Sequence, residues 1–112
     1  MGSMEMRVLG FVLLATVLEA TGDAVIRVAL HHPSLTARAG LFALGTALLG
    51  LYGTSLNLAP VDFATVTGAY ISALFVIFQI TNYLFFAAVP TPAVLAGGSL
   101  IVAGGLIVWL WR

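Results

Sequence analysis

Long runs of apolar residues, separated by short polar segments, divide this chain into four parts. Each run reaches or exceeds the roughly 20 residues that an α-helix needs to cross a bilayer. The runs are continuous rather than alternating, which excludes the strands of a membrane β-barrel. The pattern therefore predicts four transmembrane helices, at residues 8–30, 39–58, 63–89 and 93–111.

Proline and polar residues mark the breaks between these runs, at His31-His32-Pro33-Ser34, at Asn57 to Pro60 and at Pro92. Proline disfavours helix at the residue before it. Connections this short make neighbouring helices antiparallel, so we expect an all-α, up-down four-helix bundle. We expect a single domain over residues 1–112, of which residues 1–3 resemble a cloning remnant.

Composition supports a membrane protein, since 62% of the residues are apolar and 7% are charged. A soluble domain has about 25% charged residues. The absence of cysteine excludes disulfides, thiolate metal sites and cysteine nucleophiles. Four arginines balance four acids, so no basic footprint for nucleic acid is present. No serine, histidine and acid share a catalytic spacing and no metal site is evident, so we expect no enzyme, no catalytic residue and no cofactor.

One acidic residue, Glu19, lies at the centre of the first apolar run, with eleven residues of that run on either side. An intramembrane acid costs a few kcal/mol or more and by default marks an ion, proton or substrate path. Loss of hydration disfavours the charged form of a buried acid, which makes proton binding and release usable chemistry.

Asp23 and Arg27 follow Glu19 at four-residue steps, so the three share one helix face. Asp23 and Arg27 can neutralise each other as a structural charge pair, and Arg27 can reach the headgroups. Glu19 is then the acid without a partner in its own helix. A charge network that only fixes helix packing remains the alternative, and for Asp23 the two interpretations are equally favoured.

Three hydroxyl-bearing residues of the third run, Thr65, Tyr70 and Ser72, are further candidates for a proton and substrate site. Tyr70 offers a cation both a hydroxyl and a π face, although a packing role is as well supported. Hydroxyls in membrane helices usually bond to their own backbone, which is the alternative for Thr65 and Ser72. Trp109 and Trp111 are typical of an interfacial aromatic belt.

The arginines are divided equally between the two sides of the predicted bundle. Arg7 and Arg112 fall on one side, and Arg27 and Arg38 on the other. The positive-inside rule then gives no orientation. Either the tie is chance or the chain inserts both ways and forms an antiparallel pair. Gly97 and Gly104, seven residues apart on one face of the fourth run, would let helices approach closely.

Three segments together resemble the small multidrug resistance transporters, a family within the drug/metabolite transporter superfamily. They cover the first helix, the entry to the third and the approach to the fourth. The matching residues are Leu18-Glu19-x-x-Gly22-x-x-x-x-Arg27, then Leu56, Pro60 and Ala64, then Phe85-Phe86, Pro92-Ala93 and Gly97-x-x-Leu100-Ile101-x-Ala103-Gly104.

This resemblance implies an antiparallel, dual-topology homodimer in a bacterial plasma membrane. In such a dimer, the two copies of Glu19 share one central site and exchange protons for a cationic substrate. The fourth helix, with Gly97 and Gly104, would be the dimer interface.

The sequence departs from the family pattern where the family carries aromatic residues. Thr65 and Gly68 stand at those positions in the third helix, and Gly45, Leu49 and Gly50 in the second. Asp23 replaces a small hydroxyl residue. We therefore expect a smaller and more polar site than an aromatic drug pocket.

Together these features predict a proton-coupled antiporter of a small cationic solute, with Glu19 shared between proton and substrate. The alternative is a non-transporting or heteromeric four-helix membrane subunit, for example in lipid-carrier translocation. In this hypothesis, protons are the coupling ion. The other partners of the protein are the solute, the lipid bilayer and a second copy of the chain.

Overall fold

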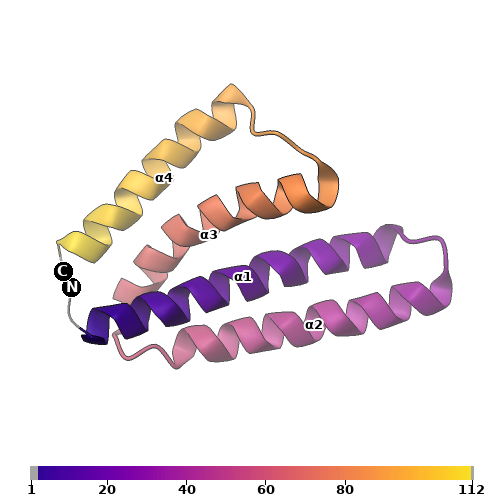
Figure 1. Ribbon diagram of the computed structural model, residues 1–112, viewed down its shortest axis with the longest axis horizontal. Helices are drawn as coiled ribbons and strands as arrows, with labels where there is room; N and C mark the ends of the chain where they lie inside the picture. Colours follow the sequence, from indigo (N-terminus) through magenta and orange to yellow (C-terminus); the bar gives the residue numbers. More distant parts are fainter. Residues whose placement is uncertain (1–2, 112) are drawn as a thin grey trace.

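The computed structural model describes residues 3–111, without the side chains of residues 3–5 and Phe63. Arg112, one of the arginines in the charge tie, lies outside the described residues, as do residues 1–2 of the segment resembling a cloning remnant. Four helices follow one another (Figure 1): α1 (Ser3–His31), α2 (Leu35–Asn57), α3 (Phe63–Phe86) and α4 (Pro92–Leu110).

Each of the four helices contains a segment that is long and apolar enough to cross a membrane. The chain is thus a multi-pass integral membrane protein by the length and composition of its helices. These segments are Met6–His31, Leu35–Asn57, Ala64–Phe86 and Pro92–Leu110.

Local capping explains where the helices depart from the expected spans. α2 begins four residues earlier than expected because the Ser34 hydroxyl accepts a hydrogen bond from the Ala37 N–H, at 3.4 Å, and caps it. α3 ends three residues earlier because Ala87 turns left-handed, with φ 52°. The Ala87 N–H there donates to the Tyr83 carbonyl at 2.9 Å. α4 starts at Pro92, after the cap residue Thr91.

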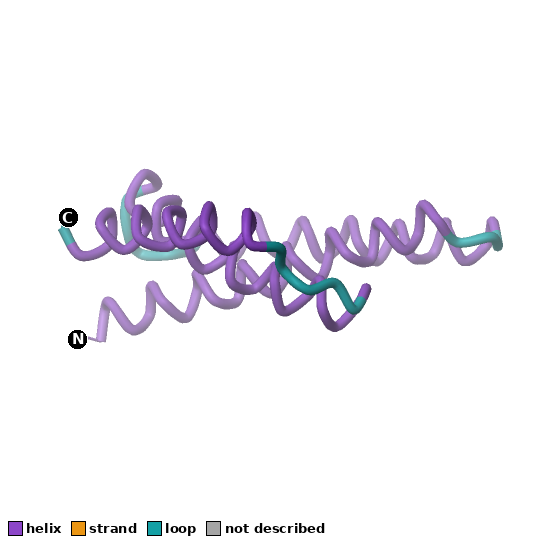
Figure 2. Tube along the Cα trace, turned by 90° about the horizontal axis from the view of Figure 1, so that it is seen from above, coloured by secondary structure: helices purple, strands orange, loops and turns teal. Residues whose placement is uncertain are grey.

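The helices form an open layer rather than a closed bundle. They lie in the order α2, α1, α3, α4, with α1 in contact with α2 and α3, and α3 in contact with α4 (Figure 1). The molecule measures 49 × 34 × 18 Å, and Figure 2 shows it from its thin side. The termini and the loop 58–62 lie at one end, opposite the loop 32–34.

Glycines mark the points where neighbouring helices approach most closely. A Cβ atom on Gly45 of α2 would meet the Ile26 side chain and the Gly22 carbonyl of α1. A Cβ atom on Gly68 of α3 would meet Val108 of α4. Two of the positions where the resembled family carries aromatic residues are therefore helix crossings in this chain, which leaves no room there for a large side chain.

The apolar core lies in the half of the molecule that contains the chain termini. It combines the first half of α1 with the end of α2, the start of α3 and the end of α4. Its buried members are Val8, Val12, Ala15, Leu56, Ala59, Val66, Tyr70 and Trp109. The expectation that Trp109 is an interfacial anchor is corrected by this packing, because α4 turns Trp109 inward; Trp111, 85% exposed, faces outward.

Candidate functional site

Glu19 lies on the side of α1 that packs against α2, three residues before the crossing at Gly22. Its Oε2 atom is buried and has no hydrogen-bond partner among the described residues. Buried polar atoms almost always have a partner, so an exception needs an explanation. The structure thus gives the central acid of the first span no structural bond that would account for it.

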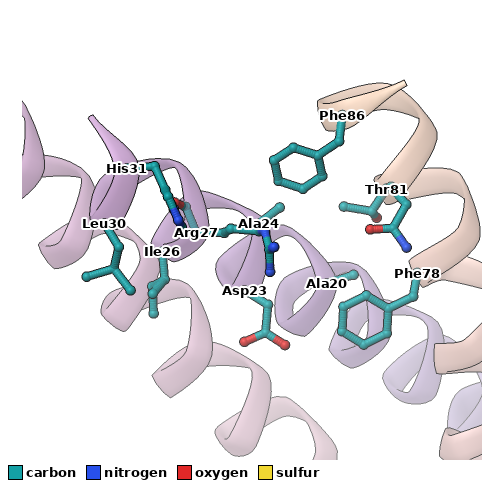
Figure 3. Close-up of a pocket in the computed structure, with 11 residues that line it drawn as sticks. Ala20, Asp23, Ala24, Ile26, Arg27, Leu30, His31, Phe78, Thr81 and Phe86 are labelled. Carbon is teal, nitrogen blue, oxygen red and sulfur yellow. The ribbon is translucent and has the colours of Figure 1, made fainter. Parts of the chain in front are cut away.

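Asp23 lies one helical turn from Glu19 and lines a cavity of about 340 Å³ between α1 and α3 (Figure 3). The two carboxylates are close enough to interact electrostatically. The cavity occupies the half of the molecule opposite the core and extends to the end of α1. Its walls are apolar with a few polar groups, and they comprise Ala20, Asp23, Ala24, Ile26, Arg27, Leu30, His31, Phe78, Thr81, Asn82 and Phe86.

Arg27 extends from the same wall toward α3 rather than toward Asp23. Its Cζ atom lies 6.0 Å from the centroid of the Phe86 ring, a cation–π distance. Within the described part of the chain, no ion pair joins Arg27 to Asp23. The pair expected from the four-residue spacing is thus not formed in this structure, in which the guanidinium lies near the Phe86 ring instead. Both charges face the cavity separately (Figure 3).

Tyr52 of α2 is a candidate that sequence reasoning missed. It lies within electrostatic range of both Glu19 and Asp23. Its ring stacks on that of Tyr70, with centroids 5.6 Å apart and planes at 24°. No signal in the sequence pointed to it, since only the structure shows that Gly45 faces α1 and that Tyr52, seven positions later, shares this side of α2.

Tyr70 is buried within the core, and its hydroxyl has no hydrogen-bond partner among the described residues. Through the ring of Tyr52, it is connected to the surroundings of Glu19. The structure therefore places Tyr52 near the candidate acid, whereas Tyr70 contacts Tyr52 from within the core.

Thr65 and Ser72 are engaged elsewhere. The Thr65 backbone N–H and hydroxyl both donate to the Asp62 carboxylate at 3.0 Å, which caps the start of α3. The Ser72 hydroxyl donates to the Ile101 carbonyl of α4 at 3.0 Å, with Val102 as a second acceptor at 3.2 Å. These two hydroxyls hold α3 in place rather than meeting Glu19.

The glycines of α4 divide between two faces. Gly98 and Gly105 face α3, where added Cβ atoms would meet Phe75 and Ser72. Gly97 and Gly104, by contrast, have nothing within 4 Å of an added Cβ atom. The predicted dimer face is therefore unoccupied within the chain and accessible to a partner.

The described residues contain no group of three or more His, Asp or Glu side chains that could hold a metal ion. Comparison with protein-family models, curated proteins and solved structures found no match to this chain. The fold and the site define a four-helix membrane protein in which a buried carboxylate oxygen, Oε2 of Glu19, has no hydrogen-bond partner among the described residues.

Proposed function

We propose that this chain is a proton-coupled antiporter of a small cationic solute, in which Glu19 binds either the proton or the solute. The observation that carries the proposal is the buried Oε2 atom of Glu19, which has no hydrogen-bond partner in the described chain. A group that serves two exchanging ligands must be free of permanent structural bonds. An acid kept only for packing would instead be satisfied by its neighbours.

A cavity that reaches from one side of the membrane to within one helical turn of this acid supports the proposal. The cavity runs from His31, at the end of α1, to Asp23, one turn from Glu19. The opposite half of the molecule is filled by the apolar core. A site near the bilayer midplane that is open toward one surface at a time is the arrangement that alternating access requires.

The open layer and the free glycine face support a dimer. A layer only 18 Å thick does not enclose a central site by itself. A second copy packed against it through Gly97 and Gly104 would enclose the site and bring a second Glu19 to it. The two acids would then titrate as one coupled unit. The resemblance to the small multidrug resistance family leads us to propose that this pair is antiparallel.

The helix crossings support a solute smaller than a large aromatic drug. Gly45 and Gly68 are filled by their neighbours and cannot be replaced by the aromatic rings of the resembled family. The aromatic group near Glu19 is Tyr52, whose ring is stacked on that of Tyr70. We propose a compact polar site in which protons and solute compete, so that the apparent solute affinity falls as the pH is lowered.

The test is Glu19→Gln, which keeps the shape of the side chain and removes its charge and titration. In proteoliposomes with a pH gradient, small amines, guanidinium compounds and quaternary ammonium ions should drive proton flux through the wild-type protein. We expect Glu19→Gln to reduce this flux at least about tenfold, the effect of losing roughly 1.4 kcal/mol of binding.

Glu19→Asp is the matched control, since it keeps a carboxylate and should retain coupled flux with an altered pH dependence. Unchanged helix content and elution volume would show that both variants fold. Wild-type flux in a folded Glu19→Gln protein would refute the antiporter.

A further inference from the structure

The cavity between α1 and α3 carries two opposite charges that are not bonded to each other. Asp23 and Arg27 lie on the same wall, one helical turn apart, and both are exposed to the cavity. Their Cα atoms are separated by about 6 Å along the helix axis. In the low-dielectric surroundings of a membrane, two such charges left apart are costly, so each needs a complementary group.

The position of each charge gives the cavity a direction. Asp23 is the deeper group, next to Glu19, which makes the inner end negative. Arg27 lies at the outer end, where it also lines a second hollow of about 490 Å³ together with His31, His32 and Phe86. The Phe86 ring and the His31 Nδ1 atom, 2.8 Å from the Arg27 carbonyl oxygen, belong to this outer end. One guanidinium, that of Arg27, therefore lies at the entrance of the cavity, and one carboxylate, that of Asp23, lies in its interior.

We infer that the solute bound in this cavity is a small zwitterion, whose cationic group binds at Asp23, one helical turn from Glu19, and whose anionic group binds at Arg27. For the binding of a cationic group, this inference rests on the proposed function. The binding of an anionic group at Arg27 is the new element. A guanidinium forms charge-assisted, often bidentate hydrogen bonds with a carboxylate or phosphate. The amides and hydroxyls of Asn82 and Thr81 line the same space. A volume of about 340 Å³ is within the usual range for small-molecule sites.

The experiment compares the affinities of matched solutes for the purified full-length chain in nanodiscs of phosphatidylglycerol by titration calorimetry. The zwitterions are glycine, β-alanine, 4-aminobutyrate and 5-aminopentanoate, which differ in the spacing of their charges. Butylamine and butyrate are the single-charge analogues of 4-aminobutyrate. We expect at least one zwitterion, the one whose charge spacing matches Asp23 and Arg27, to bind about tenfold more tightly than the amine and the carboxylate of the same chain length.

The variants assign each half of the zwitterion to its residue. Arg27→Gln should remove the preference for the zwitterion over the amine while leaving amine affinity within about twofold. Arg27→Lys, which keeps the charge without the planar fork, should restore part of the preference. Arg38→Gln is the matched control, because Arg38 is an exposed arginine near the same loop but outside the cavity.

The source of the zwitterion is tested by adding phosphatidylethanolamine, whose headgroup has the same pair of charges. Competition by this lipid would identify a headgroup as the natural occupant, and no competition would identify a free solute. The inference is overturned if no zwitterion binds more tightly than its single-charge analogues, or if the preference persists in Arg27→Gln. In either case, proton flux that still depends on Glu19 would leave the antiporter standing.

Discussion

Two residues of this chain have buried oxygens without a hydrogen-bond partner in the described part of the structure, Glu19 and Tyr70. Leaving such a group unsatisfied costs about 1–3 kcal/mol. Other buried hydroxyls are satisfied locally, since Thr16 donates to the Leu13 carbonyl at 2.8 Å and Thr81 to that of Ile77 at 2.9 Å. The Glu19 and Tyr70 oxygens are therefore exceptions among the buried polar groups, and Tyr70 is linked to the surroundings of Glu19 only through the ring of Tyr52.

Removing the Tyr70 hydroxyl should separate stability from function. We expect Tyr70→Phe to raise the free energy of unfolding by about 1 kcal/mol, because a buried unpaired hydroxyl is lost while the ring stays stacked on Tyr52. If the hydroxyl serves the solute or the proton, coupled flux should nevertheless fall. Unfolding in mixed micelles of dodecyl sulfate measures the first quantity and proteoliposome flux the second. Increased stability with wild-type flux would show that Tyr70 is only a packing residue.

At the scale of single residues, depth in the membrane could be predicted, but bonding partners could not. The length of the first apolar run places Glu19 at the centre of a helix. The four-residue spacing puts Asp23 and Arg27 side by side, yet it says nothing of Phe86, which comes from another helix to meet the guanidinium. The same holds for Ser72. The sequence of α3 does not reveal that the Ser72 hydroxyl donates a hydrogen bond to a backbone carbonyl of α4.

Helix ends were predictable to within about five residues, the largest difference being the start of α1 at Ser3, because proline and capping residues fix most of them locally. The packing faces were not. α4 is apolar on all sides, so its pattern does not identify the side that faces inward. Gly98 and Gly105 meet α3, while their immediate neighbours Gly97 and Gly104 remain free. In α2, the sequence shows Gly45 only as a position where the resembled family has an aromatic residue. The structure shows that α1 and α2 contact each other closely there.

The crossing of α1 and α2 gives a prediction at the scale of the element. We expect Gly45→Ala to lower the free energy of unfolding by about 1–3 kcal/mol, because the added methyl group overpacks against Ile26 and the Gly22 carbonyl. Gly50→Ala is the control on the same helix, with nothing within 4 Å of its Cβ atom. It should be neutral or stabilising by up to about 1 kcal/mol, since alanine favours helix. Equal effects of the two substitutions would contradict this crossing.

At the scale of the whole molecule, the four spans could be predicted and the open layer could not. Short loops require neighbouring helices to be antiparallel, but they do not decide whether the fourth helix returns to the first. Here α4 packs on α3 at the edge of the layer (Figure 1). At this edge, α4 leaves the face with Gly97 and Gly104 free. Cross-linking can therefore test directly whether a second copy binds to this face.

The position of the glycines on α4 distinguishes an antiparallel dimer from a parallel one. Gly97 and Gly104 lie on either side of the centre of α4. In an antiparallel pair of α4 helices, Gly97 of one copy therefore lies opposite Gly104 of the other, whereas in a parallel pair each lies opposite itself. The chain has no cysteine, so introduced cysteines report these distances without interference. A disulfide requires Cα atoms within about 7 Å of each other.

We expect differently tagged Gly97→Cys and Gly104→Cys copies, expressed together and oxidised in the membrane, to form mixed disulfides in several-fold excess over disulfides between like copies. Gly40→Cys, on the outer helix α2 and away from α4, provides the background level. An excess of disulfides between like copies would contradict dual topology while keeping the glycine face as an interface. Background levels in every pairing, with wild-type proton flux in the same membranes, would exclude this face from the assembly. The second Glu19 would then have to reach the site across the face of the layer between α1 and α3.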